Sequence, residues 1–325
     1  MPSRRERSWA GLRRTGPVSG KLAIFLIVAL GWSTLVGLGL FLAGVELSSG
    51  VGIAVMAVLY MPAPMVAALI AEGGLVRSRF RLPRRAWRSV LAYLGIPVVV
   101  VVGFALVFLA AVFVCGDLLG LSYFGELAST SAEIARGAEA LLGQAAVEAA
   151  GPPPPFPVLL VAGIWGAVVA GWTVNGLFAM GEEYGWRGLM WDELEHHGTV
   201  KANLIIGTVW GLWHAPVILQ GYNYPGQPLV GTLAMVAFCI GMSFALTAIR
   251  RRTGSLIPVA AAHGAFNALA PILLILAPGT SRVLTGPLGA TAAVILTVIG
   301  GLLWFIRRPL PTAPTCSVTT AADIS

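Results

Sequence analysis

Two adjacent glutamates inside an apolar stretch are the first residues whose types and spacing suggest chemistry. Glu182 and Glu183 lie in the segment GEEYGWRG, which ends with Arg187 and Gly188. In a helix, positions i and i+4 share a face, so Glu183 and Arg187 can form an ion pair. Glu182 is rotated by about 100° from Glu183 and can point elsewhere. We therefore expect a structural Glu183–Arg187 pair and a second carboxylate, Glu182, that faces a polar site.

Two histidines lie in other apolar stretches, each with a partner one helical turn away. His214 in WGLWHAP shares a helix face with Trp210, and His263 in AAHGAFNA shares one with Asn267. Acidic and imidazole side chains are rare in membrane segments, and those present usually line a water-filled site. Together with Glu182, this set offers a carboxylate and an imidazole to activate water, beside donors that could hold an oxyanion.

These residues must be positioned by helices in a membrane. The chain has 325 residues, of which 57% are hydrophobic and 11% charged, against about a quarter charged in soluble domains. This composition argues against a soluble enzyme, a nucleic-acid-binding domain or a disordered scaffold. Apolar runs long enough to cross a bilayer cover residues 22–45, 51–73, 90–115, 158–181, 202–220, 228–249, 255–277 and 283–306. We expect an all-α polytopic membrane protein with about eight transmembrane helices.

The helix rise allows the depths of the three candidate groups to be compared. At 1.5 Å per residue, His214 lies about 20 Å, His263 about 14 Å and Glu182 about 18 Å from the cytoplasmic ends of their helices. Unrelated packing residues on three helices need not share a depth. We therefore predict that the three side chains meet in one site that opens to the cytoplasm.

The basic residues predict the orientation. Of the 21 Lys and Arg residues, 19 lie in the tails or in alternate loops, counting Arg187 and Lys201 in the loop after the fourth helix. Basic residues resist translocation, so this side is cytoplasmic and both termini lie inside. The net charge of +7 then reflects membrane topology, and we expect no nucleic-acid partner.

The predicted parts are a basic tail at 1–21, a membrane domain at 22–308 with the motif core at 158–277, and a short disordered tail at 309–325. Residues 116–157 form a long, acidic outside loop with a helix-like stretch.

The three motifs resemble those of the CPBP family of intramembrane proteases. This family includes the CAAX prenyl endopeptidases and the bacterial bacteriocin-processing or self-immunity (Abi) proteins. Its pattern is EExxxR, then FxxxH, then HxxxN or HxxxD. Here the first motif spans Glu182 to Arg187, the second runs from Trp210, in place of the usual Phe, to His214, and the third runs from His263 to Asn267. The resemblance covers residues 158–277.

The resemblance implies an intramembrane endopeptidase that cleaves a peptide or a membrane-associated protein. Glu182 and His214 would activate water, His263 and Asn267 would stabilise the oxyanion, and Glu183, Arg187 and Trp210 would shape the site. Metal dependence stays open, because Glu182, His214 and His263 could instead hold a zinc ion with an open water position. No HExxH zinc signature is present.

Two other functions remain open: a non-proteolytic bacteriocin self-immunity or partner role with the same fold, and a transporter that uses Glu182 as a proton relay. The Ala-, Gly- and Arg-rich composition favours a bacterial plasma-membrane protein. The sequence does not identify the substrate.

Overall fold

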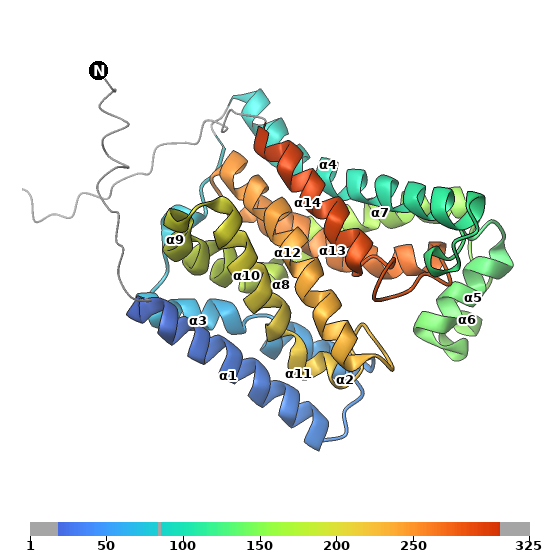
Figure 1. Cartoon of the computed structure of the whole chain (residues 1–325), viewed down its shortest axis with the longest axis horizontal. Coiled ribbons are helices and arrows are strands. Elements are labelled where there is room, and N and C mark those ends of the chain that lie inside the picture. Colours follow the sequence, from blue (N-terminus) through green and yellow to red (C-terminus); the bar gives the residue numbers. More distant parts are fainter. Residues whose placement is uncertain (1–18, 84–85, 306–325) are drawn as a thin grey trace, which may run out of the picture.

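The computed structural model describes residues 19–83 and 86–305, whose regular elements are all helical (Figure 1). The α-helices are α1 (Gly20–Leu42), α2 (Gly50–Val55), α3 (Ala63–Glu72), α4 (Trp87–Val112), α5 (Ser131–Leu142), α6 (Gln144–Ala150), α7 (Phe156–Trp172), α8 (Val174–Glu183), α9 (Trp191–Leu194), α10 (Thr199–Trp213), α11 (Ala215–Ile218), α12 (Pro228–Thr253), α13 (Ile257–Leu276) and α14 (Ala290–Phe305). Within the described ranges, β pairing is limited to an isolated bridge between Phe80 and Ser255. The predicted all-helical fold is confirmed. Most of the predicted tail at 1–21 and all of the tail at 309–325 lie outside the described residues.

The apolar helices identify a multi-pass membrane protein. Within residues 19–83 and 86–305, five are long and apolar enough to span a bilayer, namely 20–42, 50–72, 87–118, 228–253 and 257–276, and a bent pair, 156–172 with 174–197, makes up to six. Two of the eight predicted spans are shorter helices. At 1.5 Å per residue, α10 with 15 residues and α14 with 16 measure about 22 and 24 Å, less than the hydrocarbon thickness of about 30 Å. The count of eight therefore stays a prediction.

The predicted span at 158–181 is not one straight helix, because the chain bends by 56° between α7 and α8. The break is at Thr173, whose hydroxyl donates a 2.6 Å hydrogen bond to the carbonyl of Val169. Such back-bonding by Thr competes with the helix and bends it. The side-chain amide of Asn175, two residues further on, donates a hydrogen bond to the backbone carbonyl of Gly264 on α13. The bend therefore joins α8 to the helix that carries His263.

The described residues contain three π-helical segments: one at Phe113–Leu118, and two that we call the first π turn (Met56–Tyr60) and the motif π turn (Tyr184–Met190). The first π turn joins α2 to α3, and the motif π turn joins α8 to α9. Single π turns inside α-helices are often found at functional sites. The motif π turn begins directly after Glu183 and contains Arg187, so the helix continues beyond its apolar part and ends at Leu194.

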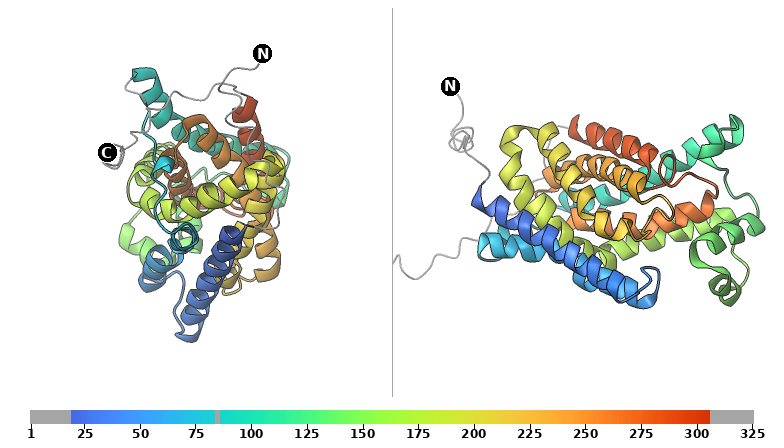
Figure 2. Two further views of the ribbon diagram at one scale, coloured as in Figure 1. Left: turned by 90° about the vertical axis from the view of Figure 1, so that its left-hand side faces the viewer. Right: turned by 60° about the horizontal axis from the view of Figure 1, so that its bottom comes forward.

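The centre of the bundle is formed by α12 and α13, with α1 and α14 on opposite outer sides (Figure 2). Helix α12 packs against α10 and α14, and α13 packs against α7 and α8. Small residues permit these close contacts. A Cβ atom at Gly207 would lie 2.4 Å from Cα of Ile240, and one at Gly241 would lie 2.3 Å from the carbonyl oxygen of Ala293. Such close backbone approach is typical of helix pairs in membranes.

Replacing Gly207 by alanine tests this packing. The added methyl group would meet the backbone of α12, which must shift, and overpacking of this kind typically costs about 1–3 kcal/mol. We expect Gly207→Ala to lower the unfolding midpoint in detergent. Gly103→Ala in α4 is the matched control, because no heavy atom of the described residues lies within 4 Å of the position that its added methyl group would take. Equal midpoints for both variants would contradict the close packing of α10 on α12.

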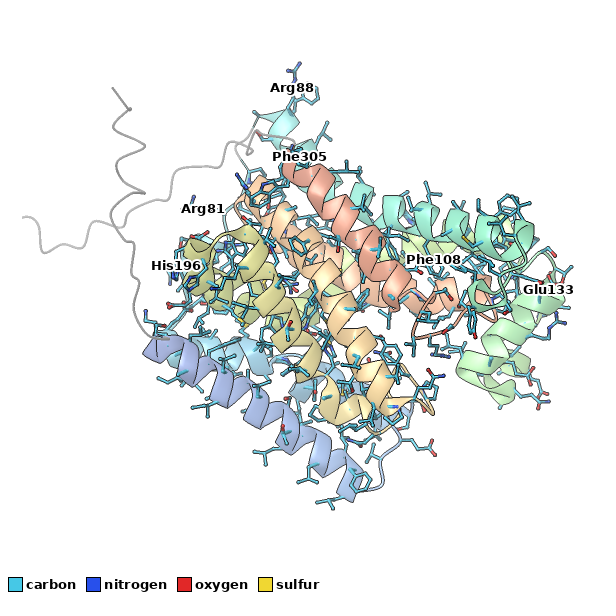
Figure 3. The ribbon with its side chains drawn as sticks, viewed as in Figure 1. Arg81, Arg88, Phe108, Glu133, His196 and Phe305 are labelled. Carbon is cyan, nitrogen blue, oxygen red and sulfur yellow. The ribbon has the colours of Figure 1, made fainter. Side chains whose placement is uncertain are left out.

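Basic residues gather at one end of the molecule. Arg81 and His196 lie at the opposite end of the long axis from Glu133 (Figure 3). The last turn of α12 adds Arg250, Arg251 and Arg252. This distribution agrees with the predicted cytoplasmic side, although the sides of the termini stay a prediction. The assignment of Arg187 to the loop after the fourth predicted helix is wrong, because Arg187 lies in the motif π turn and is fully buried.

An ion-pair cluster holds the basic end of the motif π turn. Arg79 is 6% exposed and contacts Glu72 at 2.6 Å and Asp192 at 2.8 Å, and Asp192 also contacts Arg250 at 2.5 Å. The guanidinium of Arg79 also lies 4.9 Å from the centre of the Tyr184 ring. These contacts join the end of α3 to the residues around the motif π turn.

The opposite end carries the predicted acidic loop, in which α5 and α6 form. Thr130 and Glu133 make a capping box at the start of α5, and a hydrogen bond from the Ser129 side chain lowers the pKa of Glu133, together with backbone donors. Gly137 of α5 lies against the backbone of Ile275 on α13. The loop is thereby packed onto the end of α13.

Candidate active site

The EExxxR motif lies on a helical segment that is buried on every side. All residues from Gly181 to Trp191 are buried. Glycines make this possible: a Cβ atom at Gly181 would lie 2.8 Å from Cα of Pro62, and one at Gly185 would lie 2.6 Å from Cβ of Pro64. The start of α3 therefore packs against the backbone beside both glutamates. This packing holds the motif away from lipid.

Glu183 joins two of the predicted motifs. Its Oε1 atom accepts a 3.0 Å hydrogen bond from Nη1 of Arg187, which confirms the predicted i,i+4 pair. The same oxygen lies 2.7 Å from Nδ1 of His263 on α13. The side chains of Glu183 and Arg187 are both 0% exposed. The structural role expected for this pair therefore extends to orienting His263.

The contact with Glu183 sets the tautomer of His263. A carboxylate paired with an arginine accepts hydrogen bonds, so Nδ1 of His263 carries the proton and donates it to Glu183. In the neutral ring, Nε2 then has a free lone pair. A carboxylate behind a histidine also fixes the ring orientation and stabilises an imidazolium, as in catalytic triads. His263 is thus oriented for proton transfer or, when protonated, for donation to an oxyanion.

Trp210 joins the other two predicted groups. Its indole Nε1 donates a 2.7 Å hydrogen bond to Oε2 of Glu182, and its backbone carbonyl lies 2.9 Å from Nδ1 of His214. Its ring packs edge-on against His263 with 5.3 Å between centroids, and the Arg187 guanidinium lies 4.1 Å from its centre. Four of the predicted residues, Glu182, Arg187, His214 and His263, therefore contact Trp210. Trp210 therefore contributes its indole N–H to the site, and not only the aromatic ring expected from the sequence.

The end of α10 positions His214. A backbone carbonyl can only accept, so Nδ1 of His214 donates to Trp210 and Nε2 is left free. The backbone N–H of His214 bonds to Gly211, one residue later than in a regular α-helix, which leaves the Trp210 carbonyl to the imidazole. His214 is partly exposed, whereas Glu182 is 3% exposed. Both histidines thus present Nε2 as a base.

Asn267 differs from the other candidate residues in its exposure. It lies one turn beyond His263 on α13 with an exposed side chain, and it forms no hydrogen bond with the described residues. Four residues of an α-helix advance the chain by about 6 Å. Positions i and i+4 also share a helix face, so Asn267 lies on the His263 side of α13, and its predicted oxyanion role stays a prediction.

The three candidate zinc ligands are not grouped as a ready-made metal site in the structure. Among residues 19–83 and 86–305, no three His, Cys, Asp or Glu side chains are grouped so that they could hold a metal ion. Nδ1 of His263 donates to Glu183 and Nδ1 of His214 donates to a backbone carbonyl, which leaves Nε2 of each histidine available, so metal dependence stays open. No step below is therefore derived through a metal.

The sequence analysis missed Tyr60, which lies outside all three motifs. It is fully buried, and its hydroxyl donates a 2.5 Å hydrogen bond to the carbonyl of Trp213. A signal was present, because a tyrosine in an apolar span must find a partner for its hydroxyl when buried. The sequence alone does not show which partner that is.

The segment that carries the cluster is similar to known proteins. Residues 152–269 match the family described as "Type II CAAX prenyl endopeptidase Rce1-like". This segment contains all seven predicted site residues, and it runs from the residues before α7 into α13. The resemblance seen in the three motifs is confirmed over this segment.

A curated relative agrees with that match. A segment of 49 residues is 41% identical to "CAAX prenyl protease 2" of Methanococcus maripaludis. The similarity covers 15% of this chain and 18% of the relative, so the chain matches less than a fifth of that protein's length.

Proposed function

Since residues 152–269 have the core of a CAAX-protease-type family, we propose that this protein is an intramembrane endopeptidase. One observation carries the proposal: Trp210 binds the Glu182 carboxylate through its indole and the His214 imidazole through its carbonyl. A single residue thus fixes the two groups that would share the activation of water. Glu183 contacts His263, whose ring packs edge-on against the same indole.

The proposed reaction is hydrolysis of a peptide bond by general acid–base catalysis. Glu182 and His214 together accept a proton from water while the water oxygen attacks the carbonyl carbon. The resulting oxyanion is stabilised by a protonated His263, whose positive charge is balanced by Glu183, and by Asn267. The C–N bond then breaks, and the proton taken from water passes to the leaving nitrogen. This sequence regenerates the site.

The substrate class follows from the surroundings of the site. The catalytic residues lie on helices of a membrane protein, so we propose a peptide or a membrane-associated protein that reaches the site from the bilayer. The name of the curated relative refers to prenylated CAAX proteins, which makes a lipid-bearing C-terminal segment one candidate. We further propose a plasma-membrane location, with both termini and the site opening on the cytoplasmic side, in a bacterium.

One observation favours a second function. Glu182 is 3% exposed and Glu183 is fully buried, as in a cluster that only holds the fold together. A non-proteolytic self-immunity or membrane-protein partner role would use such a cluster without chemistry. The two functions differ in whether any peptide bond is cut.

Comparative proteomics of membrane fractions tests the proposal. We expect uncut substrates to accumulate in cells carrying His214→Ala, because one of the two water-activating groups is lost. His196→Ala is the matched control, since His196 is exposed on the turn after α9. Identical peptide termini in wild-type and His214→Ala membranes, with equal amounts of folded protein, would contradict the endopeptidase and favour the non-proteolytic role.

A further inference from the structure

Tyr60 contacts the residue that precedes His214, although the two are far apart in sequence. It is the last residue of the first π turn and is 0% exposed. Its hydroxyl donates to the carbonyl of Trp213 at 2.5 Å, and its ring packs on the Trp213 ring with 4.4 Å between centroids. The ring of Trp213 in turn packs edge-on against His214 at 4.8 Å. Tyr60 therefore acts on His214 through Trp213.

The carbonyl of Trp213 needs this donor because of a proline. Helix α10 ends at Trp213, and the carbonyls of a last turn lack helical partners. Residue 216 is a proline, which has no N–H to offer, and the N–H of Val217 bonds to the carbonyl of His214. Within the described chain, the hydroxyl of Tyr60 supplies the hydrogen bond that the backbone cannot.

The residues that follow Tyr60 contact the other half of the site. Helix α3 packs against α8, and Cα of Pro62 and the carbonyl oxygen of Met61 would lie 2.8 and 2.9 Å from a Cβ atom at Gly181. Gly181 directly precedes Glu182. The short segment 60–62 therefore lies between the backbone that carries Glu182 and the backbone that carries His214.

We propose that Tyr60 is a positioning residue that fixes His214 relative to Glu182. The inference rests on the proposed endopeptidase function and adds a part of the site that the family match does not cover, since Tyr60 lies outside residues 152–269. Without the hydroxyl, the end of α10 loses its attachment to the first π turn. Nε2 of His214 then no longer has a fixed distance to the Glu182 carboxylate.

Replacing Tyr60 by phenylalanine removes only the hydroxyl. Loss of a group that orients a functional side chain, as measured around metal ligands, typically costs about 10–100-fold in activity. We expect kcat to fall by about that factor while KM changes less than about twofold, because the bound substrate is unaffected. The assay uses purified protein in liposomes, and its substrate is the membrane protein whose uncut form accumulates with His214→Ala.

Tyr224 provides a matched control. It is 1% exposed, and its hydroxyl donates to the carbonyl of Leu288 at 2.7 Å, so Tyr224→Phe also deletes a buried tyrosine–carbonyl hydrogen bond. We expect similar losses of thermal stability in both variants and a fall in kcat in Tyr60→Phe alone. An unchanged kcat in folded Tyr60→Phe, or equal falls in both variants, would overturn the proposal.

A second variant tests the role of the proline. Pro216→Ala adds an N–H three residues after Trp213, the spacing of a 3₁₀ hydrogen bond to its carbonyl, so we expect it to recover part of the lost kcat in a Tyr60→Phe background. If Tyr60→Phe does not fold alone, the double variant Tyr60→Phe/Pro216→Ala is assayed in its place. A double variant that recovers neither folding nor cleavage would count against the inference. Failure of the proposed function is distinguishable, since His214→Ala would then leave all peptide termini unchanged.

Discussion

Glu182→Gln abolishes cleavage without unfolding the protein; we expect kcat to fall by about 10²–10⁴-fold, the usual contribution of a general base. Glutamine has the shape of glutamate and keeps a carbonyl oxygen for the indole of Trp210, but it cannot take a proton from water. The expected result is therefore a folded and inactive enzyme. Cleavage rate in liposomes and the thermal unfolding midpoint in detergent measure the two properties separately.

The control for this variant is Glu139→Gln on the exposed side of α5, which makes the same chemical change far from the cluster. We expect wild-type cleavage from it. Cleavage by Glu182→Gln at more than about a tenth of the wild-type rate would show that Glu182 is not the base, because general-base catalysis contributes at least about 100-fold. The non-proteolytic role predicts no effect on protection or partner binding.

Glu183→Gln has the largest expected effect on stability. One carboxylate oxygen binds both Arg187 and His263, and all three groups are buried. Removing the negative charge leaves the guanidinium buried without a counter-charge, and breaking a buried pair in this way costs about 3–5 kcal/mol. We expect a lower unfolding midpoint and loss of cleavage together, since His263 also loses the group that orients its ring.

A double-mutant cycle separates these two effects. Glu183→Gln combined with Arg187→Met removes both charges, and replacing a buried pair by uncharged groups of similar size is often close to neutral for stability. We expect the double variant to regain most of the lost stability and to remain impaired in cleavage. Additive losses of stability in the double variant would contradict the pairing of these two residues.

Features that depend on one helix, or on composition, were predictable from the sequence. The apolar composition indicated a helical membrane protein, and the i,i+4 spacing of Glu183 and Arg187 predicted an ion pair that the structure contains. The rise along a helix also predicted that Glu182, His214 and His263 could lie at one depth. They meet around Trp210, as that argument requires.

The break at Thr173 and the length of α10 were not predictable in this way. A hydropathy window records apolar character, and a helix can bend or end inside an apolar run when a hydroxyl competes for a backbone carbonyl or a proline removes a donor. The predicted spans 158–181 and 202–220 therefore contain a bend and an early helix end. The early end of α10 directly precedes His214, and Asn175, just after the bend, contacts Gly264 beside His263.

By itself, the sequence determined the class of protein, the residues that could carry chemistry and the pairings within each helix, because those depend on composition and on 3.6-residue periodicity. Only the tertiary structure decided that Glu183 contacts His263, that Trp210 joins Glu182 to His214, and that Tyr60 bonds to the end of α10. The physical reason is that contacts between helices depend on rotation and close approach. These are set here by glycines such as Gly181 and by the bend at Thr173, neither of which spacing along one helix can reveal.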